Sequence, residues 1–140
     1  MSQYMLLLHA PQVEPDEQAE RAERAAEPPL FIELHKSLRE AGLLVSVQPL
    51  RSVESATSVR VRDGQTEIVD GPFAVTKEVL VGYYILDCAD LDEALAQAAR
   101  VPLARYGTIE VRPFLPIDEW VQEARDAGAD VPDEAVEDLA

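Results

Sequence analysis

Apolar and polar residues alternate most regularly between residues 59 and 68, on both sides of Asp63-Gly64. Glycine accepts the positive φ angle that a two-residue hairpin turn requires. A hairpin centred on this dipeptide pairs Arg62 with Gln65, Val61 with Thr66, Arg60 with Glu67 and Val59 with Ile68. That register places the valines, Thr66 and Ile68 on one face, and a shift of one residue would mix the two faces. The pattern therefore predicts a β-hairpin of defined register.

Four further segments have strand patterns. Residues 4–9 are apolar almost throughout, which is typical of a strand that is central or covered on both faces. Residues 43–50 form a short apolar segment that Pro49 ends, and residues 79–86 are the most apolar stretch, expected at the centre of a sheet. Residues 108–112 alternate like a half-buried strand before Pro113. Because proline cannot donate to a sheet ladder, the second hairpin strand must end near Asp70, before Pro72.

Two segments have helical periodicity. Over residues 30–41 an apolar stripe recurs at helical spacing, formed by Leu30, Phe31, Leu34, Leu38 and Ala41. Gly42 follows where a helix C-cap is expected. A second helix begins at Asp90, with Glu93 three residues later, and Pro102 stops it. Its predicted buried face is Leu91, Ala94, Leu95 and Ala98. Residues 12–29 are predicted to be a solvated loop with some helix over residues 18–27.

The order is strand, helix, strand, two hairpin strands, strand, helix, strand. Two helices on a mainly antiparallel sheet form an α+β sandwich. The ferredoxin-like fold is the simplest arrangement of these elements. One face of such a sheet needs cover from elsewhere, so we expect a homodimer. Residues 1–115 are predicted to be the folded domain. Residues 116–140 are predicted to be an acidic extension with a short helix over residues 118–127, in which Trp120 and Val121 are available for docking.

The amino-acid composition restricts the classes of function that this chain can have. The 140 residues include 27 acidic and 12 basic side chains, which gives a formal charge of −15. Such a chain repels phosphate backbones, so nucleic-acid binding is disfavoured. Cys88 is the single cysteine and only two histidines occur, so neither a disulfide framework nor a metal-ligand pattern is predicted. There is no basic leader and no apolar run of about 18 residues, so we expect a cytoplasmic protein that needs no membrane and no cofactor.

One tetrapeptide and the residues after it resemble the signature of a known protein family. Asp70-Gly71-Pro72-Phe73, followed by Thr76-Lys77-Glu78, is similar to the signature of the YCII-related, DGPF-domain family. In the same register, residues 81–86, 91–94 and 98–102 resemble the strand and helix that follow this motif, and residues 109–113 resemble the closing strand. Residues 4–8 and 41–44 fit the opening strand and the end of the first helix. The resemblance covers roughly residues 1–113, and the ordered set is more specific than the tetrapeptide.

The resemblance implies a dimeric α+β barrel, with a pocket between the sheet, the first helix and the partner subunit. A few relatives are similar to small lyases or dehydrochlorinases that act on cyclic compounds with a proposed histidine–aspartate pair. Others are encoded with, or fused to, alternative sigma factors, which implies a regulatory link. This chain departs from the family at Val75, where an acidic residue is usual, and near Phe31, where the shorter branch has its histidine.

Three residues are candidates for proton transfer: Asp70 with either His9 or His35. Asp70 could act as a general base or orient a substrate, although an aspartate before glycine often only caps a turn. His35 lies at the margin of the first helical stripe, and His9 ends the first strand. A histidine titrates near neutrality, but at such positions it also serves as a packing residue.

Five residues are candidates for ligand binding: Phe73, Lys77, Tyr83, Tyr84 and Arg112. Tyr83 and Tyr84 point to opposite faces of their strand, so one meets the core and the other meets the uncovered face. Lys77 could bind an anion or pair with Glu78, and Arg112 could bind a carboxylate or form a salt bridge across the sheet. Two hypotheses follow: a dimeric small-ligand-binding or regulatory module with a pocket near the Asp70 turn, or a cofactor-free lyase or isomerase that uses histidine and aspartate.

Overall fold

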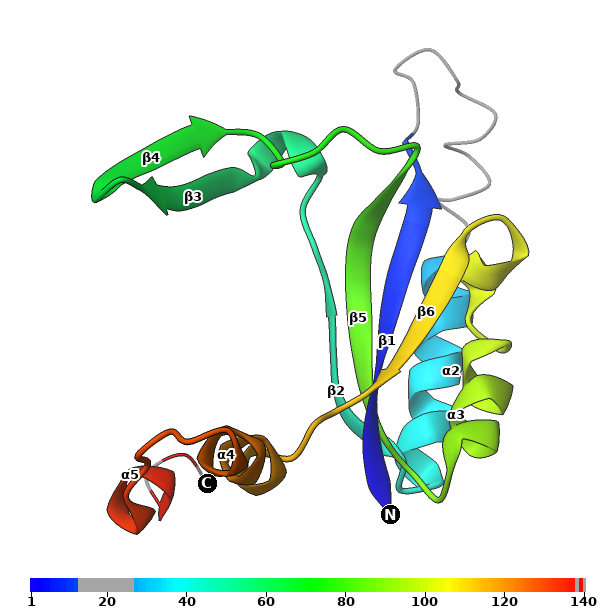
Figure 1. Ribbon diagram of the computed structural model, residues 1–140. Coiled ribbons are helices and arrows are strands. Elements are labelled where there is room, and N and C mark those ends of the chain that lie inside the picture. Colours follow the sequence, from blue (N-terminus) through cyan, green and yellow to red (C-terminus); the bar gives the residue numbers. More distant parts are fainter. Residues whose placement is uncertain (13–26, 138, 140) are drawn as a thin grey trace.

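A four-stranded antiparallel sheet is the centre of the fold (Figure 1). The computed structural model describes residues 1–12, 27–137 and 139, so most of the loop predicted over residues 12–29 lies outside the described residues. The sheet contains β1 (Ser2–Pro11), β2 (Leu44–Pro49), β5 (Glu78–Cys88) and β6 (Thr108–Pro113), in the order β2-β5-β1-β6. The two most apolar segments, β1 and β5, are the inner strands, as the sequence predicted.

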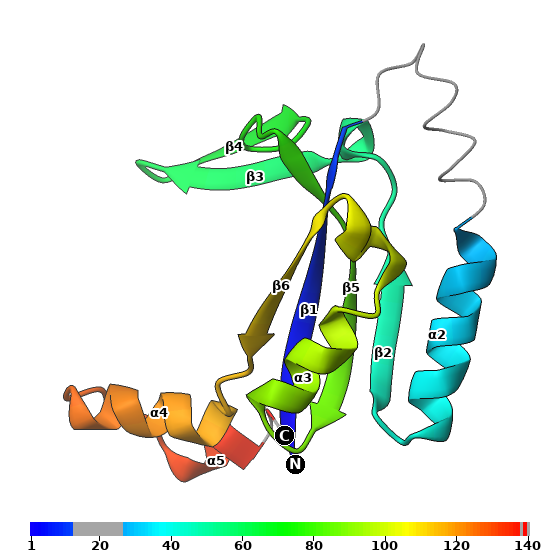
Figure 2. The same ribbon diagram turned by 90° about the vertical axis from the view of Figure 1, so that its right-hand side faces the viewer.

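Two helices cover one face of this sheet, α2 (Pro28–Glu40) and α3 (Leu91–Ala98) (Figure 2). Short 3-10 helices, η1 (Val53–Ser55) and η2 (Pro102–Arg105), lie in the connections. The order β1-α2-β2-β5-α3-β6 and the antiparallel sheet confirm the predicted ferredoxin-like α+β fold. The hairpin of β3 (Thr57–Arg62) and β4 (Gln65–Asp70) is inserted between the second and third strands of that pattern.

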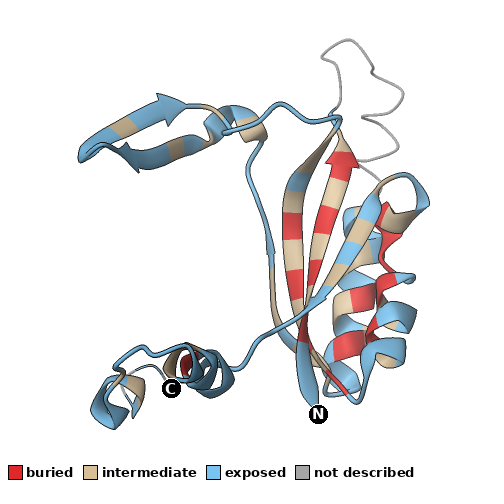
Figure 3. Cartoon of the chain, viewed as in Figure 1, coloured by how far each residue is buried: buried red, intermediate tan, exposed pale blue. Residues whose placement is uncertain are grey.

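The core lies between the sheet and the two helices (Figure 3). On β1 and β5, alternate side chains point into it, and Leu6 lies opposite Tyr84. Leu34 and Leu38 of α2 complete the layer. Burying one such side chain contributes about 1.5–3 kcal/mol, so this single apolar layer is the main source of stability. We call the other side of the sheet the open face.

Local signals fix the ends of α2. Pro28 and Pro29 occupy its first positions, where their missing N–H groups cost nothing. At the other end Gly42 has a φ of +75°, and its N–H donates to the Arg39 carbonyl at 3.0 Å. The N–H of Leu43 donates to the Leu38 carbonyl, also at 3.0 Å, which completes a Schellman cap. The predicted C-cap at Gly42 is confirmed.

Helix α3 begins at the predicted N-cap, where the Asp90 carboxylate accepts from the Glu93 N–H at 2.9 Å. Its predicted buried face is only half correct. Ala94 and Ala98 are buried, but Leu91 and Leu95 are each 47% exposed. The small alanines face the sheet, and the leucines flank them on the side turned to solvent. Leu30 of α2 and the C-cap residue Ala41, which both belong to the predicted stripe, are likewise exposed.

The hairpin has the predicted register, from Arg62 opposite Gln65 to Val59 opposite Ile68. Asp63 and Gly64 both have positive φ, 53° and 73°, as a type I′ turn requires. The hairpin projects away from the sheet on the side opposite α2 and α3 (Figure 1). Its apolar face has no cover, because Val59, Val61 and Ile68 are 58–68% exposed.

The C-terminal segment also projects from the open-face side (Figure 1). It contains α4 (Ile117–Asp126), where a short helix was predicted, and α5 (Asp133–Glu137), which the pattern did not indicate. Val121 is buried, and the Arg125 guanidinium binds the Val131 carbonyl at 2.7 and 3.0 Å and Asp133 at 3.0 Å. Trp120 is exposed.

Gly107, between η2 and β6, provides a test of this packing. A Cβ atom there would lie 2.3 Å from the His9 carbonyl oxygen and 2.5 Å from Leu103 Cδ2. We expect Gly107→Ala to lower the free energy of unfolding by about 2–3 kcal/mol in urea denaturation, because backbone must move. Gly42→Ala is the control, because a Cβ atom at this position would meet no atom within 4 Å. This substitution should lower the free energy of unfolding by only about 1 kcal/mol, since alanine disfavours the positive φ of residue 42. Equal midpoints for the two variants would contradict this account.

Candidate functional site

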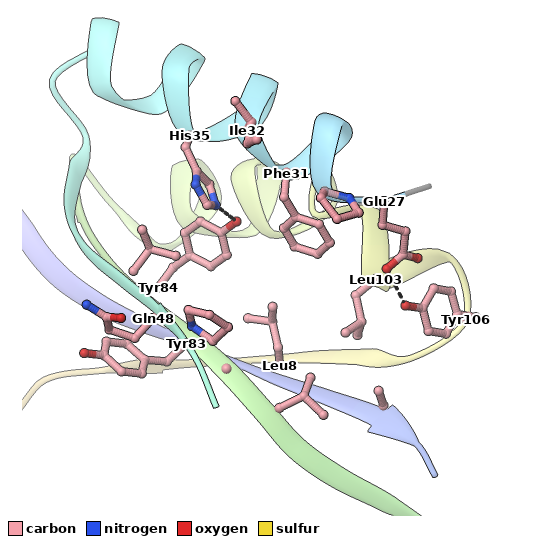
Figure 4. Close-up of a pocket in the computed structure, with 16 residues that line it drawn as sticks. Leu8, Glu27, Phe31, Ile32, His35, Gln48, Tyr83, Tyr84, Leu103 and Tyr106 are labelled. Atoms are coloured by element: carbon pink, nitrogen blue, oxygen red, sulfur yellow. Dashed lines mark hydrogen bonds between the residues drawn. The ribbon is translucent and has the colours of Figure 1, made fainter. Parts of the chain in front are cut away.

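A cavity of about 490 Å³ lies between α2 and the sheet (Figure 4). Its floor includes Leu8, Gly82 and Tyr84 of the inner strands, and Phe31 and His35 point into it from α2. The remaining lining residues are Ala10, Glu27, Pro28, Ile32, Val47, Gln48, Pro49, Val81, Tyr83, Leu103 and Tyr106. This volume is in the range of small-molecule sites, which are mainly apolar with few polar groups.

The central polar feature of the cavity is a pair formed by His35 and Tyr84. His35 Nε2 lies 2.5 Å from the Tyr84 hydroxyl oxygen, and the two rings are edge-to-face with centroids 5.2 Å apart. The Phe31 ring is also edge-to-face with the imidazole, with ring centroids 6.3 Å apart. The three aromatic rings therefore fix the position of one hydrogen-bonding group in a mainly apolar part of the wall.

Both members of the pair are uncharged at neutral pH. Burial, and then the positive charge of Arg39, lower the pKa of His35 from its usual value. Burial also raises the pKa of the Tyr84 hydroxyl. A neutral imidazole presents one donor and one acceptor nitrogen. The pair can therefore accept or donate a hydrogen bond, or accept a proton, while it carries no charge itself.

A second polar group lies at one end of the cavity. The Tyr106 hydroxyl donates to Glu27 Oε2 at 2.8 Å (Figure 4). Tyr83 and Gln48 lie at the edge formed by β5 and β2, where Tyr83 OH is 3.4 Å from Ser46 Oγ. None of the lining residues is Lys or Arg. The walls therefore favour an uncharged, largely apolar ligand over an anion.

The structure separates the two histidines. His9 lies on the open face, where its Nε2 is 3.1 Å from Glu110 Oε1. Arg112 follows on the same strand and its Nε is 3.9 Å from Glu110 Oε2, so the arginine is in a surface ion pair. His35 lies on the other side of the sheet, in the cavity. A histidine–carboxylate contact is thus present on the open face, away from the cavity.

The residues around the Asp70 turn do not line the cavity. Asp70 ends β4, pairs with Thr57 and makes no side-chain hydrogen bond within the described part of the chain. Phe73 is 96% exposed, and Lys77 is exposed as well. Of the candidates named from the sequence, the cavity brings together His35, Tyr83 and Tyr84, and it leaves Asp70, Phe73, Lys77, His9 and Arg112 outside.

Several lining residues were not candidates from the sequence. Phe31 was assigned to the core stripe, and Leu8, Leu103 and Tyr106 carried no local signal. Gly82 was the one visible sign, because a glycine inside a strand often marks a close approach of backbone. A Cβ atom there would lie 3.0 Å from the Gln48 carbonyl oxygen.

The described residues contain neither a metal-ligand cluster nor a membrane-spanning helix. No three His, Cys, Asp or Glu side chains among them are arranged to hold a metal ion. No helix in residues 1–12 or 27–137 has the length and apolar character needed to cross a bilayer.

The His35 pKa predicts a pH dependence of stability. Because the pKa of His35 is lower in the folded than in the unfolded chain, the unfolded chain binds more protons near the usual value of 6.5. We therefore expect stability to fall as the pH drops through 6.5, and expect His35→Gln to flatten that slope. Urea midpoints between pH 8 and 5.5 measure it. His9→Gln is the control, and an unchanged slope in His35→Gln would refute this assignment.

Comparison with known proteins agrees with the fold and the motif. A sequence model of the YCII-related domain matches residues 3–118, which include the whole sheet and both helices. An uncharacterized protein of Rhizobium meliloti (strain 1021) is 47% identical over 77 residues. The aligned part covers 54% of this chain and 62% of that relative. The chain therefore belongs to the YCII-related family.

Proposed function

We propose that this chain is a dimeric small-ligand-binding module whose ligand site is the cavity between α2 and the sheet. One observation carries the proposal: an apolar cavity of about 490 Å³ with a single uncharged polar pair, His35 and Tyr84, in its wall. Sites of this kind bind a compact apolar body and orient it through one or two hydrogen bonds.

The chemistry of the walls selects the ligand class. The Phe31, His35 and Tyr84 rings suit a planar cyclic compound, since edge-to-face contacts between rings are favourable. A hydroxyl or carbonyl on that compound would bond to the His35–Tyr84 pair. The ligand we propose is an uncharged cyclic molecule of one or two rings with one such group.

A binding module of this kind fits a regulatory setting. The resemblance to relatives encoded with alternative sigma factors supports a functional link of that type for this chain. The formal charge of −15 argues that such a link does not involve direct contact with nucleic acid.

A bulky residue at the cavity wall tests the proposal. Ile32 lines the cavity from α2 and is exposed, so Ile32→Trp fills space without disturbing the core. We expect wild type to bind 2-naphthol with a dissociation constant of roughly 0.1–1 mM. In Ile32→Trp this constant should rise about tenfold or more. Ligand-observed NMR titration and isothermal calorimetry at pH 7 measure both values.

Glu40→Trp is the matched control, because Glu40 is an exposed residue of the same helix outside the cavity. Its dissociation constant should equal that of wild type. Tyr84→Phe removes one hydrogen-bonding group and should weaken binding by about 3–10-fold. Equal affinities in wild type and Ile32→Trp would place any 2-naphthol binding elsewhere and remove the support for this site.

A second function, a cofactor-free isomerase or lyase, is favoured by the neutral state of His35. An uncharged imidazole in an apolar pocket is a general base. In an isomerisation it would take the proton from a carbon next to a carbonyl, and the imidazolium would return that proton to the far end of the resulting dienolate. Asp70 has no part in this version, because it does not line the cavity.

The isomerase alternative is tested with α-angelica lactone, a small β,γ-unsaturated lactone, whose conversion to the conjugated isomer is followed by ultraviolet absorbance. We expect kcat/KM to rise with pH and to level off above the lowered pKa of His35. His35→Gln should reduce the rate by about 100-fold or more. His9→Gln is the control and should keep the full rate. Turnover that survives in His35→Gln would eliminate the base assigned here.

A further inference from the structure

A second groove lies between α2 and the segment that joins α3 to η2. Its volume is about 470 Å³, and it shares no described lining residue with the cavity above. The groove is lined by Leu30, Glu33, Leu34, Ser37, Ala99, Arg100, Val101, Pro102 and Arg105. We call it the arginine groove. It is formed by the helices that cover one side of the sheet, whereas the hairpin of β3 and β4 projects on the other side (Figures 1 and 2).

The backbone that carries the two arginines of this groove is well anchored. Val101 and Leu103 lie between Arg100 and Arg105 in the sequence, and both are buried. The N–H of Arg100 donates to the Gln97 carbonyl at 3.0 Å, which extends the last turn of α3. A site on a fixed backbone loses less conformational entropy when a ligand binds. Both guanidinium groups are therefore presented from a rigid base.

Most of the hydrogen-bond donors of these two arginines are unused. The Arg100 guanidinium donates to Ser37 Oγ at 2.8 Å and to Gln97 Oε1 at 2.7 Å, and both acceptors are uncharged. Arg105 Nε donates to the Pro102 carbonyl at 3.2 Å. A guanidinium has five N–H donors. In the part of the chain that the structure describes, neither arginine is paired with a carboxylate.

The missing carboxylate partner is informative in so acidic a chain, which has 27 acidic and 12 basic side chains. Arg60, Arg112 and Arg125 each form an ion pair with an acidic residue. Glu33 also lines the groove, but among the described residues it forms no ion pair with either groove arginine. Two arginines and one glutamate give the lining a net charge of +1. An anion from solution would meet both guanidinium groups without displacing a carboxylate.

The geometry of guanidinium groups indicates which anion fits. A phosphate monoester has three acceptor oxygens and a charge of about −1.5 to −2 at neutral pH. Arginine binds such oxygens in pairs through its planar fork. Two forks from two backbone positions suit three phosphate oxygens better than the two oxygens of a carboxylate. Leu30, which is 42% exposed, adds an apolar wall to the same groove.

We propose that the arginine groove binds a phosphate group, whose oxygens Arg100 and Arg105 hold. Free phosphate and a small organic phosphate monoester both offer this group, and Leu30 would contact the carbon body of a monoester. The inference goes beyond the proposed function and does not rest on it, because the other cavity takes an uncharged ligand on a different face of α2. Glu33 carries a like charge and therefore limits the affinity.

Phosphorus NMR titration of the full chain with phenyl phosphate at pH 7.5 tests the groove. We expect wild type to bind with a dissociation constant of roughly 0.1–1 mM. Arg105→Gln should raise this constant about tenfold or more, because charge-assisted hydrogen bonds to the phosphate are lost. Glu33→Gln should lower it about two- to fivefold, since it removes a like charge beside the phosphate. A general loss of structure would not strengthen binding, so the two opposite shifts are specific to the groove.

Arg62→Gln is the matched control. Arg62 is also exposed and its guanidinium also donates to a backbone carbonyl, that of Val61 at 3.0 Å, but it lies on the hairpin. The variant changes the net charge as Arg105→Gln does, and it should keep the constant within about twofold of wild type. Equal weakening in both variants would show that only net charge matters and would overturn the inference. Absence of saturable binding to wild type up to about 10 mM would also overturn it.

Two further ligands and one variant complete the test. If phenyl phosphate binds about fivefold or more tightly than inorganic phosphate, the natural ligand is an organic monoester. If both have the same constant, and Arg105→Gln raises both, the ligand is free phosphate, and either result supports the phosphate site. Benzoate that binds as tightly as phenyl phosphate would contradict the choice of phosphate. Ile32→Trp narrows the other cavity, and a loss of phenyl phosphate binding there would place the anion in that cavity, so that only this inference fails.

Discussion

The antiparallel pairing of β1 with β5 is the constraint on which the rest of the structure depends. Because side chains alternate along each strand, this pairing assigns every second residue to the helix-covered side and the others to the open face. Tyr84 points into the core and the cavity, whereas its neighbour Tyr83 alternates to the other face and lines the cavity only at the edge formed by β5 and β2. One pair of strands thus decides which residues face α2 and the cavity and which face the open side of the sheet.

A register shift lies within this pairing. Leu8 is opposite Gly82, but His9 is opposite Leu80, so Val81 is the extra residue of a bulge. Bulges bend a strand and re-aim its side chains. Here the bulge falls on the floor of the cavity, which includes Leu8, Val81 and Gly82. The irregularity that interrupts the sheet and the missing side chain at Gly82 together open space beneath α2.

Local features of the fold could be predicted because each depends on residues close in sequence. The hairpin register follows from alternation about Asp63-Gly64, and the α2 cap follows from Gly42. The burial of Leu91 and Leu95 was predicted incorrectly, since periodicity defines a stripe but not how closely a helix approaches its sheet. The cavity could not be predicted, because Leu8, Phe31 and Tyr106 meet only after the chain has folded. The same reason explains why the turn at Asp70, although the most distinctive motif, gave no position for a ligand site.

The energetics of the cavity explain why its polar pair can persist there. Burying a hydroxyl and an imidazole without partners would cost several kcal/mol in total. Their mutual bond removes that cost, and no buried side-chain polar atom in the described residues lacks a partner. A ligand that replaces the hydrogen bond between His35 and Tyr84 must offer an equivalent donor or acceptor. A purely apolar ligand would gain no binding free energy from separating the pair. In the proposed ligand site, affinity would therefore depend on one correctly placed polar atom, while the surrounding apolar wall would provide most of the binding free energy.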